Sequence, residues 1–137
     1  RAGACVSMEA AAEIVARGER GVCQSLPQLV ASSSRLLKQV GQLAAGNEGR
    51  SLSLVSVDVR SLTGALLSLL GEAGCKSSEH LRPPLGSRLV FERWHDGAGA
   101  RWRVLWNGGD ITDGVGGCDS KFPPGCDDAM MQRTLLR

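Results

Sequence analysis

Three side chains that could hold an anion lie close together: Asp58, Arg60 and Ser61. They come at the end of the apolar stretch SLSLVSVDV and directly before a Leu-rich stretch. In an α/β sheet, the turn from a strand into a helix is where ligands and catalytic groups usually lie. The free N–H groups and the dipole of a helix N-terminus attract anions. One interpretation of these residues is therefore a site that holds a phosphorylated ligand without cleaving it.

The same residues also have a purely structural interpretation. Asp58 or Ser61 can cap the following helix by accepting hydrogen bonds from its first N–H groups, and Arg60 is then solvated or ion-paired. The two histidines, His80 and His95, fall in a linker and in a turn-rich segment. We expect both to be solvated surface residues, so the sequence offers no catalytic residue.

The elements that would position this site are a central strand and two helices. Residues 52–59 carry valines at alternate positions on one face and leucines on the other. Apolar residues on both faces are typical of a buried, parallel strand. Leucine and valine recur at helical spacing over residues 25–45 and again over residues 61–71, which predicts a helix before the strand and another after it.

A hairpin and a closing helix are predicted further along the chain. Residues 86–94 and 101–106 are two short strand-like runs separated by a turn-rich segment, and we expect them to pair antiparallel in the same sheet. Residues 129–136 predict a final helix. The order and composition of these elements indicate a single domain of the α/β class.

Two classes of partner are disfavoured by composition. The alternation of arginine with tryptophan over residues 101–106 is compatible with base stacking, but strand spacing places Trp102, Val104 and Trp106 on one buried face. Sixteen Lys and Arg against fourteen Asp and Glu leave a net charge of +2, too small to indicate a nucleic-acid partner. No apolar run reaches the roughly 18 residues of a membrane-spanning helix.

Several stretches together resemble one enzyme family. They are LTGALLSLLG at 62–71, RPPLGSRLVFERW at 82–94 and RVLWNGGDIT at 103–112, followed by cysteines at 118 and 126. In order and spacing they resemble the C-terminal part of the histidine acid phosphatases, most closely the 2-phosphoxylose phosphatase branch. The resemblance implies a three-layer αβα fold with an antiparallel strand pair. The family-like region would be residues 25–137, with residues 1–24 as an N-terminal helical extension of the same domain.

The activity of that family depends on residues that this sequence lacks. The family hydrolyses phosphomonoesters with the histidine of an Arg-His-Gly motif as nucleophile, and a later His-Asp pair binds phosphate and supplies the general acid. No Arg-His-Gly occurs in the chain. Counting from Ser56, the His-Asp pair falls on Val57 and Asp58, or one residue later. Counting back from Gly71, it falls on Val59 and Arg60. Neither register supplies the histidine, and a lone carboxylate cannot form a phosphohistidine.

The resemblance and its departures predict a non-catalytic phosphatase-like protein without a cofactor. We expect it to be a structural or interaction subunit of a multi-chain assembly. An obligate partner chain would contact the sheet edge or the face around Val55, Val57, Trp102 and Trp106. One alternative is the C-terminal chain of a processed acid phosphatase. The other is a non-hydrolysing phosphate-binding module.

Five cysteines allow disulfide bonds but give no metal-binding spacing. None forms CxxC and no histidine lies near enough for the usual zinc patterns, so we expect no metal. Cys118 and Cys126 bracket a Pro-Pro-Gly loop that lets the chain close on itself, which predicts a disulfide. Cys5 with Cys23 is a second, less clear pair, leaving Cys75 over. Disulfides favour an organelle or secretory lumen over the cytosol, while five reduced thiols remain the alternative.

Overall fold

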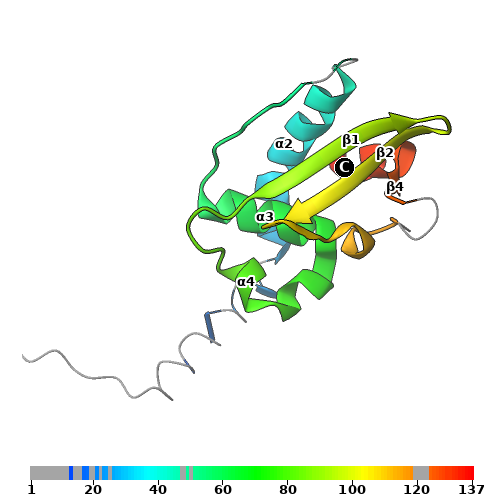
Figure 1. The fold of residues 1–137 in the computed structure, drawn as a ribbon. Coiled ribbons are helices and arrows are strands. Elements are labelled where there is room, and N and C mark those ends of the chain that lie inside the picture. The colour runs from blue at the N-terminus through cyan, green and yellow to red at the C-terminus, as the bar shows by residue number, and fades with distance from the viewer. Residues whose placement is uncertain are drawn as a thin grey trace, which may run out of the picture.

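A computed structural model describes residues 26–46, 51–118 and 124–137, together with residues 13, 17, 18, 21, 23, 24 and 49. Most of the predicted N-terminal extension, residues 1–24, lies outside the described residues, as does Cys5. The described part is a mixed α/β structure in which helices pack against one face of an antiparallel sheet (Figure 1).

Long helices come first along the chain and the sheet follows. The elements are α2 (Leu26–Ala45), α3 (Val59–Leu70), the 3-10 helix η1 (Gly71–Lys76), α4 (Ser78–Leu81), β1 (Leu89–Asp96), β2 (Gly99–Trp106), β3 (Gly109–Asp110), the 3-10 helix η2 (Thr112–Gly114), β4 (Cys126–Asp127) and α5 (Asp128–Leu135). The predicted helices at 25–45, 61–71 and 129–136 are confirmed as α2, α3 and α5, with ends shifted by one or two residues.

The predicted antiparallel strand pair is also confirmed. β1 and β2 pair along their full length, from Leu89 opposite Trp106 to Asp96 opposite Gly99. The other edge of β2 pairs with β3 at one end and with β4 at the other, so β2 is the centre of the sheet and β1 is an edge strand. Asn107 and Gly108 have positive φ angles of 48° and 86°, as the two-residue turn between β2 and β3 requires.

The prediction of a central strand at residues 52–59 is wrong. Residues 51–58 have no regular secondary structure, and Val59 is the first residue of α3. Leu52 and Leu54 are 84% and 88% exposed. A strand needs hydrogen-bonded neighbours as well as an apolar alternation, and the described part of the chain supplies none here. For the same reason the described elements form two layers instead of the predicted three.

The core lies between the sheet and the helices. Trp102, Val104 and Trp106 share the helix-facing side of β2 and are 1%, 0% and 5% exposed, which confirms the predicted buried face. Leu66 and Leu69 of α3 are likewise buried. Trp102 and Trp106 are thus covered by their own chain, so a partner on their face is excluded as the predicted contact. A partner at the sheet edge, the other contact that was predicted, stays a prediction.

The crossing of α2 and α3 depends on a glycine. A Cβ at Gly64 would lie 2.8 Å from the Leu29 carbonyl oxygen and 3.1 Å from Cβ of Ser33. The absence of a side chain lets the helices approach until the hydroxyls of Ser33 and Ser68 are 3.1 Å apart. This contact fixes the position of α3 and therefore of the Asp58 turn that precedes it.

Candidate functional site

The predicted anion site at Asp58, Arg60 and Ser61 is a helix cap. Asp58 is the N-cap of α3, and its carboxylate accepts hydrogen bonds from the backbone N–H of Ser61 at 2.8 Å and from the Ser61 hydroxyl at 3.1 Å. The structure brings these two side chains together as the structural interpretation predicted. The Arg60 side chain makes no hydrogen bond or ion pair with any described residue.

The charge at this turn is already balanced without a ligand. Hydrogen bonds from the backbone and side chain of Ser61 hold the pKa of Asp58 below its usual value. A carboxylate at a helix N-terminus is the favourable arrangement of charge and dipole. An incoming phosphate would meet this negative charge at the position where it would need the free N–H groups.

We expect substitution of Asp58 to act on stability and its pH dependence. Because its folded-state pKa is lowered, Asp58 stabilises the fold above its unfolded pKa of about 4, and this contribution is lost as the pH falls through the folded pKa. Asp58→Ala should therefore lower the unfolding midpoint in urea at pH 7. Asp58→Asn retains an N-cap acceptor and should remain near the parent while losing that part of the pH dependence. Urea titrations from pH 3 to pH 7 measure both; an Asp58→Ala variant as stable as the parent at pH 7 would contradict the capping role.

The two histidines lie apart from this turn. His95 is exposed near the end of β1, as predicted. His80 in α4 is half-buried: its Nδ1 lies 3.1 Å from the Gly74 carbonyl oxygen and its ring meets that of Trp106 edge-on at 6.1 Å. The prediction of a solvated surface residue is therefore wrong for His80, which packs against the core.

A polar cluster around Asp128 joins several elements of the described chain, and the sequence did not predict it. The Asp128 carboxylate accepts from Trp102 Nε1 at 2.6 Å and from the Arg93 guanidinium at 3.0 and 3.3 Å. Arg93 also donates to the carbonyl oxygen of Ala44 at the end of α2. The cluster thus joins α2, β1, β2 and α5.

The protonation of Asp128 follows from these contacts. Burial alone would raise the pKa of its carboxyl, but hydrogen bonds from Arg93 and Trp102, with the charges of Arg93 and His95, bring that pKa below its usual value. The carboxylate is therefore ionised and fully engaged at neutral pH. Such a group stabilises a packing arrangement and is not free to act as a general acid.

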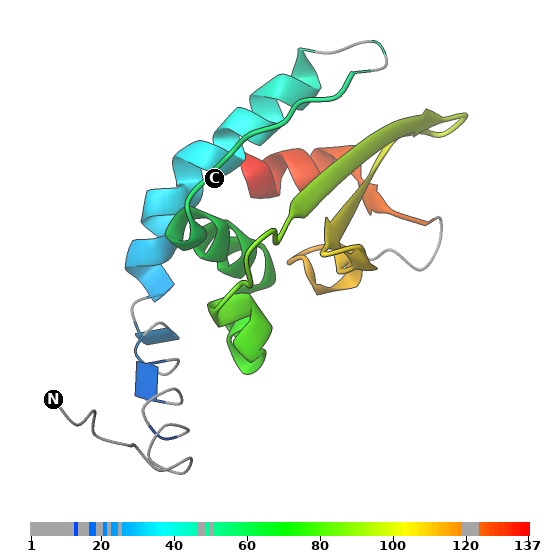
Figure 2. The same ribbon diagram turned by 60° about the vertical axis from the view of Figure 1, so that its left-hand side comes forward.

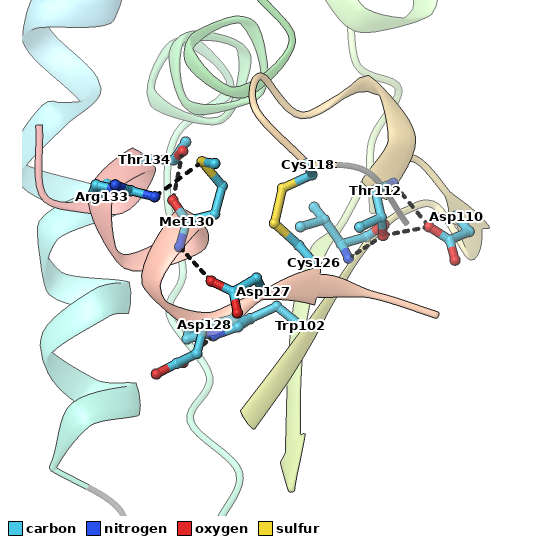
Figure 3. The surroundings of a disulfide bond; sticks show 11 residues. Trp102, Asp110, Thr112, Cys118, Cys126, Asp127, Asp128, Met130, Arg133 and Thr134 are labelled. Atoms are coloured by element: carbon cyan, nitrogen blue, oxygen red, sulfur yellow. Dashed lines mark hydrogen bonds between the residues drawn. A yellow bond between two sulfur atoms is a disulfide. The ribbon is translucent and has the colours of Figure 1, made fainter. Parts of the chain in front are cut away.

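Two disulfides hold the described chain. Cys118–Cys126, which was predicted, joins the segment after η2 to β4, next to the start of α5 (Figure 3). Cys23–Cys75 joins the segment before α2 to η1, with a Cα–Cα distance of 5.9 Å. The predicted pairing of Cys5 with Cys23 is therefore wrong, and so is a leftover Cys75. Two disulfides suit an oxidising environment.

Other binding features are few. Within the described ranges, no three His, Cys, Asp or Glu side chains gather as metal ligands would. A shallow, open depression lies along α2, lined by Ser34, Arg35, Lys38, Gln39 and Gln42. None of the helices that the structure describes is long and apolar enough to cross a membrane.

The most conspicuous surface feature is apolar. Eight large hydrophobic residues are exposed in the described chain, and five of them lie between residues 52 and 59: Leu52, Leu54, Val55, Val57 and Val59. Scattered single exposed hydrophobics are normal, but five within eight consecutive residues are a local concentration of apolar side chains in water. This segment, not a pocket, is the best candidate for a functional site.

Comparison with known proteins identifies no relative of this chain. No family model matches the chain, and neither a curated protein nor a solved structure matches it. The resemblance to the histidine acid phosphatases therefore stays a prediction from the sequence.

Proposed function

We propose that this chain is a non-catalytic, histidine-acid-phosphatase-like protein that serves as a structural or interaction subunit of a larger assembly. Its partners are other protein chains. The two disulfides favour assembly in an oxidising compartment, such as an organelle or secretory lumen.

The observation that carries this proposal is the exposure of residues 51–58. A sequence with apolar residues on both faces is suited to the interior of a protein, yet Leu52 and Leu54 lie almost wholly in solvent. Burying an exposed leucine side chain in an interface is favourable by a free energy of about 1.5–3 kcal/mol. A partner chain that covers several of these residues gains this free energy on association.

The residues of the strand-like stretch 51–58 and of the turn after it speak against catalysis. Val57, Asp58 or Val59 stands where the resemblance would place a phosphate-binding histidine, and the Asp58 carboxylate is held by Ser61 as a cap. A cap held in this way favours neither alternative function. The phosphate-binding module would need free N–H groups beside Arg60, and the processed phosphatase would need the missing histidine.

The proposal is tested by making the exposed segment polar. In the double variant Leu52→Ser/Leu54→Ser we expect weaker binding of the dye bis-ANS and less self-association at high concentration, with the thermal midpoint unchanged. The matched control is Leu85→Ser, because Leu85 is 99% exposed but lies outside the segment. Fluorescence titration and light scattering measure these effects, and calorimetry gives the midpoint.

Two outcomes would contradict the proposal. Loss of stability in the double variant would show that both leucines belong to the core of the isolated chain. Hydrolysis of p-nitrophenyl phosphate at acid pH that persists through purification and disappears in Asp58→Asn would show that the chain is an enzyme. We expect no turnover above background in the parent.

A further inference from the structure

We infer that residues 51–58 are a site of limited proteolysis, where an endopeptidase that prefers leucine before the cleaved bond cuts after Leu52 or Leu54. The product is a two-chain protein joined by the Cys23–Cys75 disulfide. Cleavage at this segment concerns the free chain and does not require the proposed interaction function. Three features point to it: a backbone without hydrogen bonds, exposed leucines, and a disulfide that spans the cut.

The backbone of residues 51–57 is not tied to the rest of the described chain. None of these residues makes a hydrogen bond with any described residue, and the first hydrogen bonds after them are those of the Asp58 cap. An endopeptidase binds its substrate as an extended strand and pairs with the backbone on both sides of the bond that it cleaves. The segment can adopt this pairing without breaking a hydrogen bond within the described chain, so cleavage here requires no local unfolding.

The segment is also accessible from solvent along its whole length. Every residue from 51 to 60 is exposed, with Leu52 at 84% and Leu54 at 88%. In both views the segment runs as a thin tube from beyond the end of α2 to the start of α3 (Figures 1 and 2). Either leucine side chain can therefore enter the apolar pocket with which a protease of this specificity holds the residue before the cleaved bond.

Exposure alone does not make such a site, as Leu85 shows. Leu85 is 99% exposed, yet it lies in a turn in which the N–H of Ser87 donates to the carbonyl oxygen of Pro84 at 3.1 Å. The next residue, Gly86, has a φ angle of 80°, a left-handed conformation that an extended strand does not have. A protease would have to open this turn before it could bind the chain. Leu85 is therefore an internal comparison for the two leucines of the segment.

The Cys23–Cys75 disulfide spans the cut. Cys23 precedes α2 and Cys75 lies in η1, so the two fragments made by this cleavage remain covalently joined. The fragments are also packed together, because Leu29 and Leu37 of α2 are buried in the core. We therefore expect cleavage to leave the fold intact.

The chemical step is the hydrolysis of one peptide bond. Water supplies a hydroxyl group to the leucine carbonyl carbon and a proton to the nitrogen of the next residue, and the C–N bond between them breaks. The products are a new carboxylate at the end of the first chain and a new ammonium group at Ser53 or Val55 on the second. The protease lowers the barrier and is not consumed.

The test is digestion of the purified full chain by chymotrypsin, at a low ratio of protease to protein and under native conditions. Samples are separated with and without reductant, and the fragments are identified by N-terminal sequencing. We expect a chain that begins at Ser53 or Val55 to form at least about tenfold faster than the product of a cut after Leu85, whose turn must first open. The product should remain one species without reductant and give two with reductant, and its circular dichroism should match that of the uncut protein.

A pair of prolines provides the matched variant. Ser53→Pro/Val55→Pro places a proline after each leucine, where the missing N–H and the fixed φ angle obstruct binding to a protease. Neither N–H donates a hydrogen bond to a described residue, so we expect the thermal midpoint to be unchanged while cleavage after Leu52 and Leu54 falls at least about tenfold. Ser53→Ala/Val55→Ala keeps both N–H groups and should be cut like the parent.

Four results would overturn the inference. They are a first cut after Leu85 or within β1 or β2, resistance of residues 51–58 in the parent, equal cleavage of the proline and alanine variants, and release of the two fragments without reductant. None of these results decides the proposed interaction function, which the variant Leu52→Ser/Leu54→Ser tests on the uncut chain.

Discussion

Trp102→Ala is expected to lower the free energy of unfolding by about 3–5 kcal/mol, the usual cost of truncating a buried aromatic residue. Trp102 is 1% exposed at the centre of the core, and its Nε1 donates to Asp128. The substitution removes the ring and leaves one acceptor of that carboxylate unsatisfied. Urea unfolding followed by circular dichroism measures the loss.

Two further variants show how much of this loss comes from the hydrogen bond and how much from the position of the ring in the core. Trp102→Phe keeps most of the volume but loses the N–H, and should cost about 1–2 kcal/mol. Trp94→Ala truncates a half-buried tryptophan on the opposite face of the sheet and should cost less than Trp102→Ala. Equal losses for Trp94→Ala and Trp102→Ala would show that the core is not centred on β2.

Removing the two disulfides should give unequal losses, the larger for Cys23–Cys75. This bond closes a loop with a sequence separation of 52, whereas Cys118–Cys126 spans 8. The chain-entropy relation gives about 4 kcal/mol for the longer loop and about 2.5 kcal/mol for the shorter one. Cys23→Ala/Cys75→Ala should thus have the lower urea midpoint of the two double variants.

The comparison has an internal control in the reduced parent. Under strong reductant, the parent protein and the variant lacking both bonds should unfold at similar urea concentrations. Cys126 is fully buried, so its replacement also changes core packing. Cys118 is only half-buried. The single variant Cys118→Ala therefore removes the cross-link with less change in core packing. A larger loss from Cys118→Ala than from Cys23→Ala/Cys75→Ala would contradict the loop-length argument.

Sequence patterns predicted the elements whose causes are local. Helical spacing located α2, α3 and α5, and strand alternation with an intervening turn located the β1–β2 hairpin and its buried tryptophan face. Residues 51–58 have an equally clear pattern, but a strand exists only where another backbone lies beside it. The pattern indicates that residues 51–58 could form a strand. They do not form one because no other described strand lies beside them.

The candidate site was predictable only in part, for a similar reason. The Asp58 cap depends on residues three apart and was one of the two interpretations offered. The Cys23–Cys75 bond forms because the packing of α2 on α3 brings the segment before α2 next to η1. The spacing of the cysteines in the sequence does not reveal this contact. Asp128 looks like an ordinary acidic residue at a helix start. The available signal was Trp102, because a tryptophan on a buried strand face needs a partner for its N–H.

The place of β4 and α5 in the sequence has a consequence for synthesis. Cys126, Met131 and Leu135 are all fully buried, and β4 pairs with the centre of the sheet through β2. A ribosome adds residues at about 5–20 per second. The core therefore cannot close before residues 126–135 have left the ribosome. Until then the nascent chain exposes part of the helix-facing side of β2, and a chaperone or the eventual partner has that interval in which to bind it.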